Sequence, residues 1–277
     1  KTPAPMTIEF KDRKPDFDVN QALFVGKPAE DGSGIEYEYS NGQTVVKKSY
    51  RFRKDSYRSE VDSEDSAPGA TLPHYLVWRG GFGDPTIQNA PAVERTVYWD
   101  NADSRLFSKT ASDAKNGPVN VSGAFVFAGI EDPYFTAVVL PGGSGTMELR
   151  TYADELPYGD KNERFVGAAI GGAGVNHLPL FVGPKDSDIL KAVDPRLENL
   201  IDWGRWFGFL AKPLFYVLNW TNDRISHNFG WAIVLITIAI NMATLPLRLS
   251  SMKSAKKMQG LQPQIAASEG LTRIYGE

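Results

Sequence analysis

The side chains best suited to acid–base chemistry in this chain are three histidines, His74, His177 and His227. General acid–base catalysis near neutral pH usually combines a histidine with a carboxylate around the substrate. His74 lies in an apolar run close to Trp78, where a structural histidine is expected, and His227 adjoins a long uncharged segment. No histidine pair has carboxylates at metal-ligand spacing. The sequence therefore predicts no enzyme activity, no metal site and no cofactor.

A glycine-rich run at residues 171–174 has the composition of a phosphate-binding loop. Such a loop opens a helix, whose first N–H groups bind the phosphate. Residues 178–182 look extended instead, so we expect the glycines to form a turn between strands.

Two polar side chains, Thr237 and Asn241, lie in a segment without charges and are the candidate substrate-contacting residues. An amide at membrane depth costs free energy unless it meets a partner or water. The two residues are four positions apart, on one face of a helix, where they would line a hydrated groove. A structural interpretation stays open for both, because threonine can return its hydroxyl to the preceding turn and Asn241 is near the end of the segment.

The uncharged segment comprises the nineteen residues 229–247. As a helix it would be roughly 28 Å long, close to the ~30 Å hydrocarbon thickness of a bilayer. We predict a transmembrane helix at residues 227–248, which Pro246 kinks or ends near the membrane boundary. The alternative is a buried helix in the core of a large soluble domain.

Charge predicts the orientation of this helix. Residues 248–277 hold five basic and two acidic groups, whereas residues 1–200 hold 22 basic and 29 acidic groups. The positive-inside rule puts residues 249–277, the start of a basic helical region, in the cytoplasm and the large domain in the periplasm. The candidate cytoplasmic contacts are Arg248, Lys253, Lys256 and Lys257. A net charge of +3 over this tail predicts contact with anionic lipid or ribosome rather than specific nucleic-acid binding.

Aromatic residues concentrate in residues 203–226, around Arg205 and Lys212. Tryptophan and tyrosine favour the headgroup level of a membrane, so this segment is predicted to be an interfacial amphipathic helix. Its anchoring residues are Trp203, Trp206, Phe207 and Trp220. The alternative is an aromatic helix in the core of the preceding domain.

Residues 1–185 read as strands separated by turns, without a helix long enough for a parallel crossover, and predict an antiparallel β-sandwich. Residues 186–202 predict helical pieces that pack on the sandwich, begin at a cap on Asp186 and are interrupted by Pro195. The chain has no cysteine, which excludes disulfides and thiolate metal sites. The predicted strands are residues 43–54 and 95–99, both as edge or surface strands, and residues 74–78, 124–130, 135–140, 147–152, 165–170 and 178–182.

Several motifs resemble the bacterial YidC membrane protein insertases, of the YidC/Oxa/Alb family. They include Gly-Ile-Glu-Asp-Pro-Tyr-Phe at residues 129–135, Phe-Val-Gly-Pro-Lys at 181–185, Leu-Ile-Asp-Trp-Gly at 200–204 and the run from Asn228 to Ile265. The resemblance is close over residues 124–265 and rests on strand pattern alone over the first hundred residues.

This resemblance implies a periplasmic sandwich of galactose-mutarotase-like fold, followed by the first of five core helices around a hydrophilic groove. It implies an inner-membrane insertase and chaperone of Gram-negative bacteria that makes no covalent bonds. Its expected partners are nascent membrane proteins, the Sec translocon, the ribosome and membrane lipids. The family usually has an arginine in the groove at the position of Asn241, so the charge that attracts substrates is missing here.

The resemblance also predicts that the chain is a fragment, because a signal-anchor helix would precede Lys1 and further core helices would follow Glu277. The alternative function is a membrane-tethered periplasmic module that binds carbohydrate or protein. An inert anchor would need neither Asn241 nor the patterned tail at residues 251–265. The shared fold also raises a sugar-converting enzyme, but the sequence lacks a convincing histidine and carboxylate pair for it.

Overall fold

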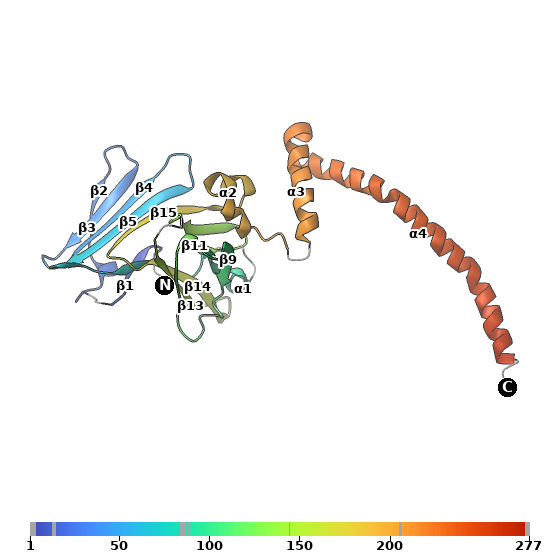
Figure 1. Cartoon of the computed structure of the whole chain (residues 1–277), viewed down its shortest axis with the longest axis horizontal. Coiled ribbons are helices and arrows are strands. Elements are labelled where there is room, and N and C mark those ends of the chain that lie inside the picture. The colour runs from blue at the N-terminus through green and yellow to red at the C-terminus, as the bar shows by residue number, and fades with distance from the viewer. Residues whose placement is uncertain are drawn as a thin grey trace. The chain divides into compact units, whose positions relative to one another are not determined.

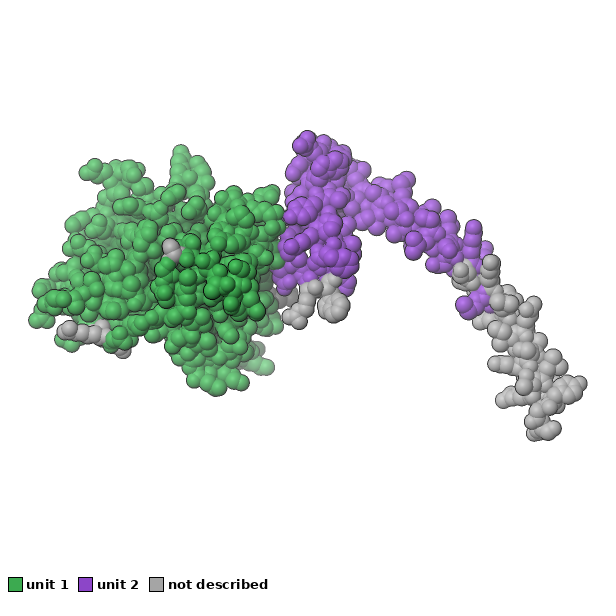
Figure 2. Space-filling model, in the orientation of Figure 1, with its two compact units in different colours: residues 1–201 green, residues 202–277 purple. Residues whose placement is uncertain are grey.

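The computed structural model describes residues 4–12, 15–83, 87, 89–143, 145–204 and 207–274. The chain divides into two compact units, Lys1–Ile201 and Asp202–Glu277, which Figure 2 shows in separate colours. The first unit contains the strands and the second contains two long helices (Figure 1).

Two antiparallel sheets build the first unit. The smaller sheet has five strands in the order β1-β7-β14-β13-β10. These strands are β1 (Thr7–Phe10), β7 (His74–Trp78), β14 (Lys161–Gly171), β13 (Met147–Tyr158) and β10 (Val119–Gly123). The larger sheet has ten strands, in the order β2-β3-β4-β5-β15-β12-β11-β8-β9, with β6 paired to β5. They are β2 (Val25–Pro28), β3 (Gly34–Ser40), β4 (Val45–Phe52), β5 (Arg58–Ala67), β6 (Ala70–Thr71), β8 (Arg95–Asp100), β9 (Arg105–Lys109), β11 (Phe125–Glu131), β12 (Phe135–Val139) and β15 (Val175–Pro184).

The main core lies between the two sheets, because side chains alternate along each strand. On β11, Ala128 and Ile130 join the cluster that also contains Leu76 and Ile170 of the smaller sheet. Phe127, on the opposite face of β11, joins a second cluster outside the sandwich. The antiparallel β-sandwich is therefore confirmed.

Two short helical pieces cover that second face of the larger sheet. They are α2 (Ser187–Val193) and the 3₁₀ helix η2 (Pro195–Leu200), and they bury Leu190, Leu197 and Leu200 against strands β8, β11, β12 and β15. Asp186 caps α2 by accepting hydrogen bonds from the N–H groups of Asp188 and Ile189. The remaining short helices of this unit are η1 (Val19–Gln21) and α1 (Ala90–Val93). The cap on Asp186 and the packing of both pieces agree with the sequence analysis.

Every predicted strand is present. Of the two that were predicted as edge or surface strands, neither is an edge strand, because β4 lies between β3 and β5, and β8 lies between β11 and β9. Strand β4 does lie at the surface, since seven of its eight residues are at least partly exposed. The sequence does not predict β3, β5 or β9, which supply the missing neighbours. Strand β5 is the clearest case, since only Val61 and the terminal Ala67 among its ten residues are apolar. Its inward positions carry Ser63 and Asp65, which break the apolar alternation that marks a strand.

The second unit consists of α3 (Gly208–Thr221), a five-residue π-helical turn η3 (Asn222–Ser226) and α4 (Phe229–Ile274). His227, with a φ of 48°, ends the π-helical turn, and Asn228 Oδ1 accepts the N–H of Gly230 at 2.8 Å to cap α4. Helix α4 curves gently (Figure 1) and continues for 28 residues beyond Pro246. The prediction that Pro246 could end the helix is wrong, because proline removes only one of many backbone hydrogen bonds in so long a helix.

Candidate functional site

Helix α4 contains a segment long and apolar enough to cross a membrane, Phe229–Lys253. It includes the predicted uncharged run and extends past Arg248 to Lys253. Almost none of its surface is buried, and large side chains such as Trp231 and Ile233 are more than half exposed. A core helix of a soluble domain would bury these side chains, so that alternative does not fit the structure.

The polar side chains of this segment bond to their own helix. Thr237 Oγ1 donates to Ile233 O at 2.7 Å, and Asn241 Nδ2 donates to Thr237 O at 2.8 Å. These bonds satisfy the hydroxyl and one amide hydrogen within the helix, as the structural interpretation of both residues expects. The carbonyl oxygen of Asn241 remains an acceptor that a partner can use, because the side chain is exposed.

A third polar residue, Thr244, extends this surface and was missed by the sequence analysis. Its hydroxyl lies 2.9 Å from Ile240 O and 3.2 Å from Asn241 O. Residues 237, 241, 244 and 248 follow helical spacing, so Thr237, Asn241, Thr244 and Arg248 share one face of α4. The sequence signal that could have identified Thr244 is its spacing of three residues from Asn241 and seven from Thr237 within the apolar run. We call these four residues the polar stripe.

The predicted interfacial anchors divide into two kinds. Phe207 and Trp220 are 72% and 59% exposed, as residues that contact a membrane surface must be. Trp203 instead packs within the second unit. The centroid of its ring lies 5.1 Å from that of Phe215 and 5.8 Å from Lys212 Nζ. Trp206 lies outside the described residues.

The candidate cytoplasmic contacts continue along α4. Arg248, Lys253 and Lys256 are exposed, while the side chain of Lys257 lies outside the described residues. Arg248 belongs to the polar stripe, and the two lysines follow it on the same helix. Their side chains are long enough to place the charge at a headgroup while the stem remains in lipid.

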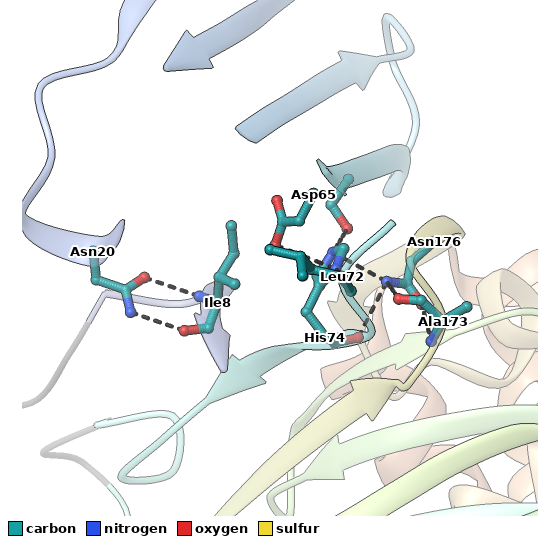
Figure 3. Close-up of polar contacts among 8 residues, drawn as sticks. Ile8, Asn20, Asp65, Leu72, His74, Ala173 and Asn176 are labelled. Atoms are coloured by element: carbon teal, nitrogen blue, oxygen red, sulfur yellow. Dashed lines mark hydrogen bonds and ion pairs between the residues drawn. The ribbon is translucent and has the colours of Figure 1, made fainter. Parts of the chain in front are cut away.

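His74, the strongest candidate for acid–base chemistry, is a buried structural residue (Figure 3). Its Nδ1–H donates to Leu72 O at 2.9 Å, because a carbonyl can only accept. Its Nε2 lies 2.7 Å from Ser63 Oγ and 3.1 Å from Asn176 Nδ2, and accepts from them. Both ring nitrogens are thus engaged, and the ring joins β5, β7 and β15.

Asp65 completes an arrangement that resembles a serine hydrolase triad. Its Oδ2 lies 3.2 Å from His74 Nδ1, on the far side of the ring from Ser63. Yet Ser63, Asp65 and His74 are at most 2% exposed, so no substrate carbonyl can reach the Ser63 hydroxyl. Burial raises the pKa of Asp65 to about 7 and lowers the pKa of His74, while the nearby Lys48 ammonium opposes the shift of Asp65. The arrangement is a polar cluster in the sandwich core and has no route to catalysis.

The remaining sequence candidates do not form a site. His177 is exposed, and its Nδ1 is in hydrogen-bond contact with the Asp62 carboxylate on the outer face of the larger sheet. The glycines at residues 171–174 connect β14 to β15 and precede no helix, as expected. Among the described residues, no group of three His, Asp or Glu side chains is placed to hold a metal ion.

Two family models match the chain, one after the other. The model described as the YidC periplasmic domain matches residues 4–217, which include all but three of the first hundred residues. The model described as the 60Kd inner membrane protein matches residues 220–269, which contain the membrane-spanning segment. The two matches meet within the last turn of α3, in the second unit.

Proteins named membrane protein insertase YidC are similar to most of the chain. The one from Pelobacter propionicus is 30% identical over 240 residues, or 84% of this chain and 43% of its own length. Those from Geobacter sulfurreducens and Anaeromyxobacter sp. are 30% and 28% identical and cover 88% and 86% of this chain. The chain spans less than half the length of these relatives. Because the periplasmic-domain model alone covers the whole sandwich and most of α3, the chain belongs to the YidC family of membrane proteins.

Proposed function

We propose that the chain provides the periplasmic domain and the first core helix of an insertase that moves nascent membrane proteins into the inner membrane. The observation that carries this proposal is the direct succession of the two family matches over a β-sandwich and a spanning helix. The three relatives described above carry the name membrane protein insertase, which supports the same activity. No covalent chemistry is proposed, since the Ser63, His74 and Asp65 cluster is closed to substrate.

The polar stripe is the part of this chain that we expect to meet a substrate. The side chains of Thr237, Asn241 and Thr244 donate hydrogen bonds to backbone carbonyls of their own helix. Burying them in an apolar environment therefore costs little free energy. Facing a groove formed with further helices, the Asn241 carbonyl would accept hydrogen bonds from a passing chain. It would attract acidic substrate segments less than an arginine does, because hydrogen bonds to ionised groups are roughly twice as strong.

The activity is tested with the full-length protein in liposomes. We expect a newly synthesised single-span protein to become protected from protease in these liposomes but not in protein-free ones. Deleting residues 15–180 should leave most of this insertion intact, because the sandwich is not proposed to line the groove. A liposome assay without insertion would contradict the proposal. Full loss on deletion would instead favour the membrane-tethered binding module.

Introducing a charge at Asn241 should change substrate preference. In the full-length protein, Asn241→Arg is expected to raise insertion of clients with acidic translocated segments several-fold, since a cation in a groove attracts carboxylates. Asn241→Leu should lower insertion modestly, and Thr237→Val, on the same face, serves as the uncharged control. Equal insertion by all three variants, at equal protein levels, would show that this face does not meet the substrate.

The sandwich is proposed to lie in the periplasm and the end of α4 in the cytoplasm, as the basic residues after the span favour. Because the chain has no cysteine, single cysteines report on topology without background. In spheroplasts, Gln43→Cys should react with a membrane-impermeant maleimide, whereas Lys253→Cys should react only after permeabilisation. The opposite labelling pattern would reverse the proposed orientation.

The proposed partners follow from this placement. Nascent membrane proteins are the substrates, either alone or delivered through the Sec translocon, and the basic residues beyond Arg248 are placed to contact the ribosome or anionic lipid. Exposed Phe207 and Trp220 support contact of α3 with the membrane surface.

A further inference from the structure

Three segments meet at one end of the larger sheet, in the first unit. The turn between β4 and β5, the turn between β11 and β12 and the end of β15 come together there, because β5, β15 and β12 are antiparallel neighbours. The Val182 N–H donates to Tyr57 O at 3.0 Å, and the Lys185 N–H donates to Tyr134 O at 2.7 Å. We call this end, residues 51–58, 133–135 and 182–185, the basic–aromatic tip.

The tip exposes large apolar side chains. Phe52, Tyr57, Tyr134, Phe135 and Val182 are 58%, 51%, 62%, 42% and 37% exposed, respectively. Isolated exposed apolar residues are normal on a protein surface, but a cluster drawn from three segments indicates a binding surface. Four of the five are aromatic, the type that prefers the boundary between water and lipid.

The charge of the tip is opposite to that of its domain. Residues 51–58 read Arg-Phe-Arg-Lys-Asp-Ser-Tyr-Arg, with four basic groups and one acidic group, in a domain with a net charge of −7. Arg53 is paired with Glu60 at 2.8 Å, and Asp31 of the β2–β3 turn is near enough to Arg51 for the two charges to attract each other, but both Arg51 and Lys54 are exposed to solvent. The two acids of the neighbouring turn, Glu131 and Asp132, are buried, and Asp186 and Asp188, at the start of α2, are the acids that follow the end of β15. The exposed part of the β11–β12 turn therefore carries no anion.

The aromatic part of the tip is held rigidly. Asp132 Oδ1 accepts the N–H groups of Tyr134 and Phe135 at 2.6 and 2.5 Å. Beneath the turn, Lys185 Nζ lies 2.9 Å from Glu131 Oε2 and donates to Asp132 O at 3.1 Å. A surface that is already fixed loses little conformational freedom on binding, so even weak contacts there are effective.

We propose that the basic–aromatic tip binds the anionic phospholipid headgroups of the membrane that α4 crosses. Phe52, Tyr57, Tyr134 and Phe135 would lie at headgroup level, and Arg51 and Lys54 would face the lipid phosphates. Three observations favour lipid: the charge complementarity, the aromatic composition, and attachment of the domain to a spanning helix of the same chain. That attachment keeps the local lipid concentration high, so a low intrinsic affinity is sufficient.

The test uses the cysteine-free full chain in liposomes of two compositions, phosphatidylcholine alone and phosphatidylcholine with phosphatidylglycerol. An environment-sensitive fluorophore is attached at Ser56→Cys within the tip, and at Gln43→Cys in the turn at the opposite end of β4 as the control. We expect the fluorophore at residue 56 to shift to the blue and to be quenched by brominated lipid only in the anionic liposomes. The fluorophore at residue 43 should report water in both.

Removing the exposed cations should release the tip. Each basic residue near an anionic surface contributes about 1 kcal/mol, or roughly fivefold in the docked-to-undocked ratio. Arg51→Gln with Lys54→Gln should therefore lower that ratio about 25-fold, and 0.5 M salt should act in the same direction. Tyr134→Ser with Phe135→Ser, checked for native circular dichroism, should also lower it.

Three results would overturn the proposal: equal signals from residue 56 in both liposomes, an equal response at residue 43, or full quenching after loss of both cations. Docking seen in native membranes but absent from phosphatidylglycerol liposomes would also overturn it, and would assign the tip to a protein partner. None of these readouts depends on insertion activity.

Discussion

Replacing Lys185 with methionine is expected to lower the free energy of unfolding of the sandwich by about 3–5 kcal/mol. Lys185 Nζ lies 2.9 Å from Glu131 Oε2, and the two side chains are only 9% and 7% exposed. Burial already raises the pKa of Glu131, and Lys185 is the main group that opposes this shift. Methionine would leave a buried carboxylate with Arg95, at 3.5 Å, as its remaining cation.

Denaturant unfolding of the full chain in detergent, followed by circular dichroism, measures this loss. Arg164→Met is the matched control, because its ion pair with Glu155 joins two residues that are more than half exposed. The control should lose at most about 1 kcal/mol. Adding Glu131→Gln to Lys185→Met should recover much of the stability by removing the unpaired charge. Equal losses in the buried and exposed pairs would contradict the account of this turn.

Replacing Asp65 with asparagine is expected to stabilise the sandwich at pH 8 and to have little effect at pH 4.5. Burial raises the pKa of Asp65 to about 7, compared with an ordinary value of about 4. Between these values the folded state binds a proton that the unfolded state does not, so this residue's contribution to stability falls as pH rises. At about 1.4 kcal/mol per pH unit, the difference reaches about 4 kcal/mol by pH 7.

Two neighbouring groups modify the size of this effect. The pKa of His74 is lowered by burial, so below pH 6.5 its contribution falls as pH falls, in the native protein and the variant alike. Lys48, with a pKa lowered to about 8, loses the attraction of Asp65 in the variant, which reduces the gain at pH 8. The difference between the two unfolding free energies from pH 4.5 to 8 therefore cancels the contribution of His74 and reports on Asp65 together with its attraction to Lys48. Glu163→Gln, exposed on β14 and not among the groups that shift the pKa of Asp65, is the control. A difference that does not vary with pH would show that Asp65 is already ionised in the folded state at pH 4.5.

The sequence identified several residues correctly for reasons that were local. His74 was expected to be structural because its neighbours are apolar, and the cap on Asp186 follows from a residue that acts within one turn. Trp203 shows a limit of this reasoning. Its type and position predict a membrane anchor, which stays a prediction, but they do not predict its contact with Phe215 within its own unit.

The strands with polar inward positions show a second limit. Strand β5 lacks the alternating apolar pattern that predicts a strand, because two of its buried positions carry the polar residues Ser63 and Asp65. Their environment is created by Lys48, His74 and Asn176, and Asn176 is 102 residues distant from His74 in the chain. Polar residues become acceptable in a core only when their partners arrive through folding.

The sequence by itself determined the membrane span, the strand-rich domain and the acidic and basic division of the chain. These properties depend on composition and periodicity over five to twenty consecutive residues. Such a segment prefers lipid or water according to its own side chains, whatever the rest of the chain does. Only the tertiary structure decided the strand order, the buried Asp65 and His74 cluster, the Lys185 and Glu131 pair and the basic–aromatic tip. Each of these joins segments that are distant in sequence, and their energies arise from contacts and burial that exist only after the sheets have paired.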